Sequence, residues 1–335
     1  MTRCNSKPWA NRVRMLAVVM LAAGAPVGCA PPGGLLIRPV GIDRTLEETV
    51  LLADSRWAAA KIAVIDVDGI LMNRPKPELL GEGEHPVSLL LEQLDRARRD
   101  RRVEAVLLRI NSPGGSVTAS EMMHDEVMHF RRSGKPVVAV MTDVAASGGY
   151  YVACACDRIV AHRSSVTGSI GVIMQLFDLT GAMAKLGVSG EAITSGPNKA
   201  GGSPFAPLTD EQRAIFQGVV DELHERFVAV VAAGRPTLDE AGVRKLADGR
   251  IFTAQQALEA GLIDEIATMR QAVAALKRQI GADSVKLVAY HRPLGYKPNY
   301  YAEGPAATIE ANLVKFDLTG WQQQAAPRFM YLWSP

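Results

Sequence analysis

Short apolar runs alternate with segments of helical periodicity through the middle of this chain, and this alternation limits its fold more than any other feature. Residues 61–68 are rich in β-branched side chains and end at Gly69, as expected for a strand. Residues 105–110 are almost continuously apolar, which is typical of a strand buried on both faces of a parallel sheet. The same pattern predicts strands at residues 136–141, 158–161 and 188–194.

Helical periodicity fills the intervals between these runs. It predicts helices over residues 88–100, 118–132 and 148–156, with shorter ones over 239–246, 254–259 and 269–279. Thr209 and Gln212 form a capping box, so we expect a long helix that starts there and ends at Gly234. Strands that alternate with helices imply an α/β fold, a largely parallel sheet of βαβ units flanked by helices.

The first 28 residues are typical of an export signal. They hold four basic and no acidic residues, and their apolar stretch at 15–27 is shorter than the ~20 residues that span a bilayer. Gly28 and Cys29 resemble the lipobox of bacterial lipoprotein precursors, in which the cysteine is lipidated; Pro26 departs from that motif. Ordinary secretion and an uncleaved N-terminal anchor remain alternatives to lipidation at Cys29.

Charge and cysteine content exclude several classes of protein. Beyond residue 28 the chain carries 33 basic and 35 acidic residues, so no excess of positive charge suggests a nucleic-acid partner. Four cysteines are too few for a disulfide scaffold. Cys154 and Cys156 lie in an apolar segment without clustered histidines, which predicts buried free thiols rather than a metal site.

Candidate catalytic residues fall in four segments of small residues. In AASGGYY, Ser147 lies between two alanines and two glycines, which leaves room for a substrate backbone; a helix N-cap is the structural alternative. SPGGS, at 112–116, follows a predicted buried strand, where ligands bind in α/β folds, and TGSIG follows at 167–171. Lys199 is the only charge between residues 192 and 206.

The order of five motifs resembles that of the signal peptide peptidase A family of the Clp/crotonase superfamily. The motifs are RINSPGGSVTAS, KPVVAV, AASGGYYVA, TGSIGV and the glycine-flanked lysine. The resemblance covers about residues 61–270. It implies that Ser147 is the nucleophile, Lys199 the general base and Ser169 a hydroxyl that positions the lysine. It also implies that the amides of Gly114 and Ser147 form the oxyanion hole. Pro197 and Asn198 depart from the bulkier residue expected before the lysine.

Physical chemistry agrees with these roles. A serine hydroxyl is a poor nucleophile until a base removes its proton. A lysine amine acts as that base only when it is neutral, which burial away from carboxylates favours, and the window around Lys199 holds no acid. A Ser-His-Asp triad is the alternative, but none of the six histidines comes with an obvious orienting acid; they are His85, His124, His129, His162, His224 and His291.

The resemblance implies a membrane-associated endopeptidase in the bacterial cell envelope that cleaves hydrophobic peptides such as signal peptides, works as a homo-oligomer and needs no cofactor. A crotonase-type acyl-handling protein and a non-catalytic lipoprotein scaffold are the alternatives. We expect a signal at residues 1–28, a spacer at 29–60 and a Clp/crotonase-like peptidase domain at 61–280. Residues 281–335 are expected to be a C-terminal extension that packs in the oligomer.

Overall fold

The computed structural model describes residues 45–76, 84–292 and 329–333. The chain divides into two compact units, residues 1–43 and 44–335, and all that follows concerns the second. The expected signal and Cys29 lie outside the described residues. Within the described residues, no helix is long and apolar enough to cross a membrane.

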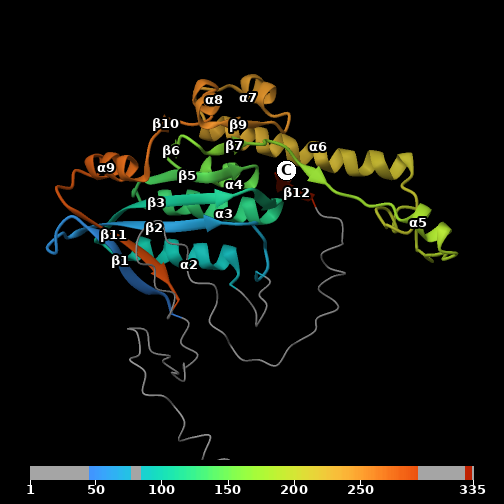
Figure 1. Ribbon diagram of the computed structural model, residues 1–335, viewed down its shortest axis with the longest axis horizontal. Helices are drawn as coiled ribbons and strands as arrows, with labels where there is room; N and C mark the ends of the chain where they lie inside the picture. Colours follow the sequence, from blue (N-terminus) through green and yellow to red (C-terminus); the bar gives the residue numbers. More distant parts are fainter. Residues whose placement is uncertain (1–44, 77–83, 293–328, 334–335) are drawn as a thin grey trace, which may run out of the picture. The chain divides into compact units, whose positions relative to one another are not determined.

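A nine-stranded sheet forms the centre of this unit, and its main path runs β1-β11-β2-β3-β5-β6-β10 (Figure 1). Along this path all neighbours from β11 to β10 are parallel, and the one antiparallel pair of the path is β1 with β11. The strands of this path are β1 (Glu47–Ala53), β2 (Ala60–Asp68), β3 (Val103–Ser112), β5 (Val137–Ala146), β6 (Arg158–Ala161), β10 (Glu265–Ile266) and β11 (Val285–His291). The expectation of an α/β fold with a largely parallel sheet is thereby confirmed.

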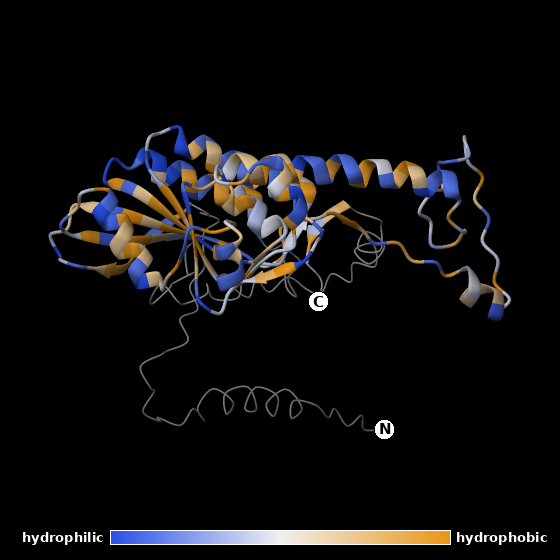
Figure 2. Cartoon of the chain, turned by 90° about the horizontal axis from the view of Figure 1, so that it is seen from above, coloured by the Kyte–Doolittle hydropathy of each residue, from blue (hydrophilic) through white to orange (hydrophobic). Residues whose placement is uncertain are grey.

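Both faces of the sheet are covered, which explains the continuous apolar run of β3. On one face Val106 and Leu108 join the larger core, to which α2 (Pro86–Arg99), α3 (Val117–Arg131) and α4 (Gly148–Ala153) contribute. On the other, Ala105 and Leu107 pack with α9 (Met269–Gln279) in a second core. Figure 2 shows the apolar strands gathered between these layers.

The structure corrects three expectations about organisation. Residues 47–53, expected in a spacer, form β1 at the edge of the sheet, and residues 285–291, expected in a C-terminal extension, form β11 next to it. The folded domain therefore includes both segments, because β11 pairs with β2 and β1 pairs with β11. Residues 188–194, predicted as a strand, have no regular structure, and α5 (Thr180–Lys185) lies just before them.

The long helix α6 (Asp210–Gly234) begins at the predicted capping box of Thr209 and Gln212. Only its last third is packed, because Phe227, Val228 and Val231 are buried whereas most side chains before residue 227 are exposed or half-buried. The helix extends beyond the sheet toward α5 in Figure 1. The remaining helices are α7 (Glu240–Leu246) and α8 (Ala254–Glu259).

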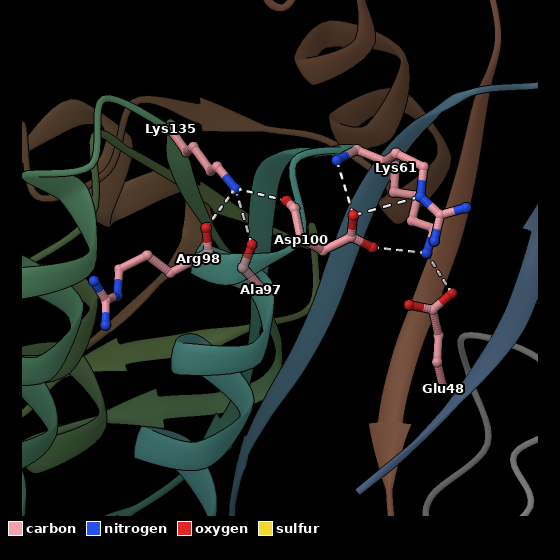
Figure 3. Close-up of polar contacts among 7 residues, drawn as sticks. Glu48, Lys61, Ala97, Arg98, Asp100 and Lys135 are labelled. Atoms are coloured by element: carbon pink, nitrogen blue, oxygen red, sulfur yellow. Dashed lines mark hydrogen bonds and ion pairs between the residues drawn. The ribbon is translucent and has the colours of Figure 1, made fainter.

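A buried lysine, Lys61, forms ion pairs with the edge strand β1 and with the turn after α2 (Figure 3). Lys61 is 4% exposed, and its Nζ lies 2.6 Å from Oε1 of Glu48 and 2.9 Å from Oδ2 of Asp100. Nearby, Nζ of Lys135 donates to the carbonyl oxygens of Ala97, Arg98 and Asp100 at the end of α2. These contacts satisfy carbonyls that a helix end leaves without an intrahelical partner.

Cys154 and Cys156 are free and buried, as predicted. Burial raises the pKa of the Cys154 thiol to about 12. The thiolate is the nucleophilic form of cysteine, so these groups are unreactive near neutral pH.

Candidate active site

Ser147 stands between the end of β5 and the start of α4 in a conformation that few residues adopt. Its φ and ψ are 51° and −117°, and the residue is only 1% exposed. It occupies the N-cap position, but its side chain makes no capping hydrogen bond, so the hydroxyl does not serve the structural role that was the alternative. Backbone strain of this kind concentrates at functional sites.

Ser169 shares this unusual backbone. Among the described residues, Ser147 and Ser169 are the only non-glycine residues with positive φ. The strand β7 (Val166–Gly168) runs parallel to the end of β5, with Ala146 opposite Gly168, and the amide of Ser147 donates to the Gly168 carbonyl at 2.7 Å. The amide of Ser169 donates to the carbonyl of Arg250, just before β9 (Ile251–Thr253), at 2.7 Å. Two predicted site residues are thus brought side by side.

The glycines of the SPGGS segment make a turn that no larger residue could make. Gly114 has a φ of +101°, and a Cβ there would lie within 3.0 Å of both the Tyr331 carbonyl oxygen and the Gly148 nitrogen. A Cβ at Gly115 would lie equally close to the backbone of Leu71. The turn therefore fits directly against the start of α4, next to Ser147.

The expected oxyanion donors are not free. The Ser147 amide donates to Gly168, and the Gly114 amide donates to Oγ of Ser112 at 3.0 Å. Gly148, which sequence reasoning missed, supplies the first amide of α4, and such an amide has no acceptor within its helix. The signal available in the sequence was its place directly after Ser147, the expected nucleophile, at a helix N-terminus that suits anions.

An extended segment of the chain lies across this turn. The strand β12 (Phe329–Leu332) pairs antiparallel with β4 (Gly114–Ser116), with Tyr331 opposite Gly115, and with β8 (Ile173–Met174). Both the Tyr331 carbonyl oxygen and the Gly148 nitrogen lie within 3.0 Å of one point, the Cβ position that Gly114 lacks. β12 thus occupies the position between β4 and β8, referred to as the groove, and its Tyr331 carbonyl oxygen lies close to the first residue of α4.

The side chain of Tyr331 fills an aromatic pocket behind the groove. Its ring stacks on Tyr151 at 5.1 Å and lies 4.7 Å from Phe227, and its hydroxyl donates to the carbonyl of Leu223 at 2.8 Å. His124 contacts the edge of Tyr151 at 5.2 Å, and burial lowers the pKa of this histidine, an effect that Asp125 partly offsets. The pocket suits a large aromatic or apolar side chain.

Lys199 does not reach this site within one chain. Its side chain is exposed, and the preceding Pro197 accepts a 3.0 Å hydrogen bond from Gln212, in the first turn of α6. Phe227, which contacts Tyr151, is 15 residues farther along the same helix. At 1.5 Å per residue this separation is about 22 Å. The structure therefore assembles Ser147, Ser169 and the glycine turn but leaves the expected base apart.

No group of three or more His, Cys, Asp or Glu side chains that could hold a metal ion occurs among residues 45–76, 84–292 and 329–333. Nδ1 of His124 lies 3.4 Å from Asp125, and the His124 ring packs on the ring of Tyr151. The groups gathered around Ser147 are hydroxyls and backbone amides, which serve acyl-transfer chemistry.

Known proteins resemble this chain along most of its length. The sequence profile of peptidase family S49 matches residues 129–283. A putative signal peptide peptidase SppA of Enterococcus faecium is 31% identical over 299 residues, which cover 87% of this chain and 86% of that protein. Protease 4 of Haemophilus influenzae is 35% identical over 213 residues, 64% of this chain and 34% of that protein.

A chloroplastic serine protease, SPPA, of Arabidopsis thaliana is 33% identical over 238 residues, 70% of this chain and 35% of that protein. The chain spans about a third of the length of the Haemophilus and Arabidopsis proteins, and most of the Enterococcus one. The resemblance read from the sequence motifs is confirmed. The chain belongs to peptidase family S49, the signal peptide peptidase A family of serine peptidases.

Proposed function

We propose that this chain is an endopeptidase that hydrolyses hydrophobic peptides with Ser147 as nucleophile and Lys199 as general base. The observation that carries the proposal is β12, an extended segment that pairs with the glycine turn beside Ser147 and turns a carbonyl toward Gly148. A peptide bound in the same way would add a strand to β4 and β8, a common mode of peptide recognition. Its scissile carbonyl would then lie at the first turn of α4.

Each catalytic step has a group to perform it. Oγ of Ser147 attacks the carbonyl carbon while the neutral amine of Lys199 takes the hydroxyl proton. The tetrahedral oxyanion accepts a hydrogen bond from the Gly148 amide, and Gly114 lies on the other side of the oxyanion. One such donor lowers the activation free energy by about 3 kcal/mol. The lysine ammonium then protonates the leaving amine, and water, activated by the same lysine, hydrolyses the acyl-enzyme.

Substrate preference follows from the pocket that Tyr331 fills. Tyr151 and Phe227 offer aromatic faces, and aromatic pairs add stabilisation beyond the area they bury. We expect cleavage after aromatic or large apolar residues, such as those of signal peptides.

The dyad is proposed to form between two copies of the chain. Lys199 lies on a segment whose apolar side chains are widely exposed, and the first half of α6 is unpacked. Exposed apolar surface of this extent marks an interface. The exposed apolar residues are Phe177, Leu179, Leu186, Val188, Ile193, Phe205 and Ile215. A neighbouring copy that covers this segment would also bury Lys199 beside Ser147 and Ser169.

Attachment to the membrane is proposed through the N-terminal segment, by lipidation at Cys29 or by an uncleaved helix, in the bacterial cell envelope. Mass spectrometry of the mature N-terminus separates these cases. A lipid mass on Cys29 supports lipidation, and an unmodified residue beyond it contradicts lipidation.

The test uses the purified full chain and a fluorogenic apolar peptide. Ser147→Ala and Lys199→Ala should each abolish cleavage, whereas Ser133→Ala and Lys245→Ala, matched changes of exposed residues outside the proposed interface, should not. If the dyad forms between copies, subunits of the two inactive variants mixed in equal amounts should regain about a quarter of the wild-type rate, the share of interfaces with both groups intact. Cleavage at the wild-type rate by the Ser147→Ala variant overturns the proposal.

A further inference from the structure

We infer that Ser112 is a positioning residue for this reaction: its hydroxyl holds the glycine turn at 113–115 in register with the helix that follows Ser147. The inference rests on the proposed function, since it concerns the groove in which the substrate carbonyl would lie. Ser112 itself does not touch the reacting atoms. It acts through Gly114 and through the first turn of α4.

The hydroxyl of Ser112 is fully buried and is bonded on both sides. It donates to the carbonyl oxygen of Gly69 at 2.6 Å and accepts the amide of Gly114 at 3.0 Å. Gly69 follows β2, and its own amide donates to the carbonyl of Asn111 at 2.9 Å. One side chain therefore joins the ends of two adjacent parallel strands to the turn beyond them.

An irregularity in β5 brings Ser112 opposite a residue close to Ser147. The pairing of β3 with β5 shifts between Ile110 and Ser112, so that Ser112 lies opposite Ala145. Bulges of this kind re-aim side chains and are frequent beside active sites. From Ile110 to Ser112 the strand β3 advances two residues, whereas β5 advances four, from Met141 to Ala145, so the extra residues lie on β5. With regular pairing Ser112 would lie opposite Asp143 instead of Ala145, which is two residues before Ser147.

The backbone of Ser112 also touches the nucleophile's helix. A Cβ at Gly149 would lie 2.7 Å from the Ser112 carbonyl oxygen and 3.3 Å from the Ser112 Cβ. Gly149 is therefore needed for close approach, and Ser112 lies between the first turn of α4 and the glycine turn. Because the Gly114 amide is directed at Ser112, the Cα of Gly114 faces Gly148 and the carbonyl of Tyr331.

The Ser112 hydroxyl holds the glycine turn in place through a hydrogen bond and not only through packing. Its removal leaves the Gly114 amide without its acceptor and lets the turn shift relative to Gly148. A displacement of about 1 Å at a catalytic site can lower the rate by about 100-fold. Peptide affinity should change little, because pairing along β4 and the aromatic pocket remain.

The experiment compares Ser112→Ala, Ser112→Thr and Ser112→Cys in the full chain. We expect the alanine and cysteine variants to lose about 100-fold in kcat with KM within about threefold of wild type, and threonine, which keeps the hydroxyl, to stay within about tenfold. The rate of acylation by a serine-directed inhibitor should fall in parallel with kcat. Thr49→Val, which removes from β1 a hydroxyl that is hydrogen-bonded to His291 of β11, serves as the control for stability loss remote from the site.

The results distinguish a failure of the inference about Ser112 from a failure of the proposed function. If the cysteine variant keeps wild-type kcat while alanine does not, the side chain's size matters and the inference is wrong; equal kcat in all three variants also overturns it. If the alanine variant does not fold, the threonine and cysteine pair alone decides. Wild-type activity in Ser147→Ala would instead refute the proposed function, whatever the Ser112 variants do.

Discussion

The amide of Ser147 donates a 2.7 Å hydrogen bond to the carbonyl oxygen of Gly168, and this bond fixes the backbone of the proposed nucleophile to a neighbouring strand. It joins two short segments that carry the positive φ of Ser147 and Ser169. A strained backbone persists only where surrounding contacts hold it. The conformation of Ser147 therefore depends on β7 as much as on its own loop.

Gly168→Ala should disturb both stability and catalysis. Gly168 has a φ of +85°, and an added Cβ would lie within 3.0 Å of the Phe252 ring. We expect a loss of about 2 kcal/mol in unfolding free energy from overpacking and strain, together with a drop in kcat of about tenfold or more as Ser147 shifts. Urea unfolding and steady-state kinetics measure the two effects.

Gly134→Ala is the matched control, because Gly134 has a φ of +81° but no atom within 4 Å of an added Cβ. It should cost about 1 kcal/mol of stability and leave kcat unchanged. Equal losses of kcat in both variants would show that the position of Gly168 has no special role.

Removal of β12 should free the groove. A variant that ends at residue 328 lacks the strand that pairs with β4 and the ring that fills the pocket of Tyr151 and Phe227. An internal segment competes with substrate at a high effective concentration. We therefore expect KM for an aromatic peptide to fall by about tenfold, measured on the purified variant, with Tyr331→Ala intermediate. A higher KM in the shortened chain would mean that β12 builds the groove instead of occupying it.

Acid should weaken the edge of the sheet through Asp100. Burial alone would raise the pKa of this carboxyl, but hydrogen bonds from Lys61 and from the Arg102 amide lower it to about 2. Because the folded pKa lies below the unfolded value of 3.8, the stabilisation is full above pH 4 and is lost as the pH falls toward 2. Partial exposure limits it to about 1 to 2 kcal/mol.

Chemical unfolding between pH 2 and pH 6 tests this expectation. Asp100→Asn should flatten the acid limb of the stability curve and lower stability at pH 6. An unchanged acid limb in the variant would assign the loss to other carboxylates.

The C-terminal end of α6 should depend on one ion pair. Arg235 is 6% exposed, and its Nη2 and Nη1 lie 2.7 Å and 2.9 Å from the carboxylate of Asp264. Loss of one partner of a buried pair leaves an uncompensated charge, so Arg235→Met should cost about 3 kcal/mol of unfolding free energy. The double variant with Asp264→Asn should recover part of this loss. Additive losses in the double-mutant cycle would contradict the pairing.

The sequence predicted the parts of the fold that local patterns encode. The run at 105–110 became the core of β3, and the capping box at Thr209 began α6 at the expected residue. The place of β11 could not be foreseen, because residues 285–289 pair with 60–64 across most of the chain and nothing local records that choice. The apolar residues at 188–194 carry no strand, since they have no neighbouring strand to pair with in the described chain.

The candidate site was foreseen in composition but not in arrangement. Ser147, Ser169 and Gly114 do converge, because parallel β3, β5 and β7 end at one edge of the sheet. The hydrogen bonds that occupy the Ser147 and Gly114 amides depend on strand register and turn geometry, which motifs do not specify. Lys199 was expected to act as the base for Ser147, yet within one chain its segment is hydrogen-bonded to the start of α6, away from Ser147.

The strand order also governs how the protein can be made. Because β11 lies between β1 and β2, one edge of β2 stays without a partner until residue 285 and its neighbours have been synthesised. An unpaired, apolar strand edge invites association with other chains. Incomplete chains, whether from stalled translation or from proteolysis before residue 285, should therefore aggregate rather than settle into a smaller native form.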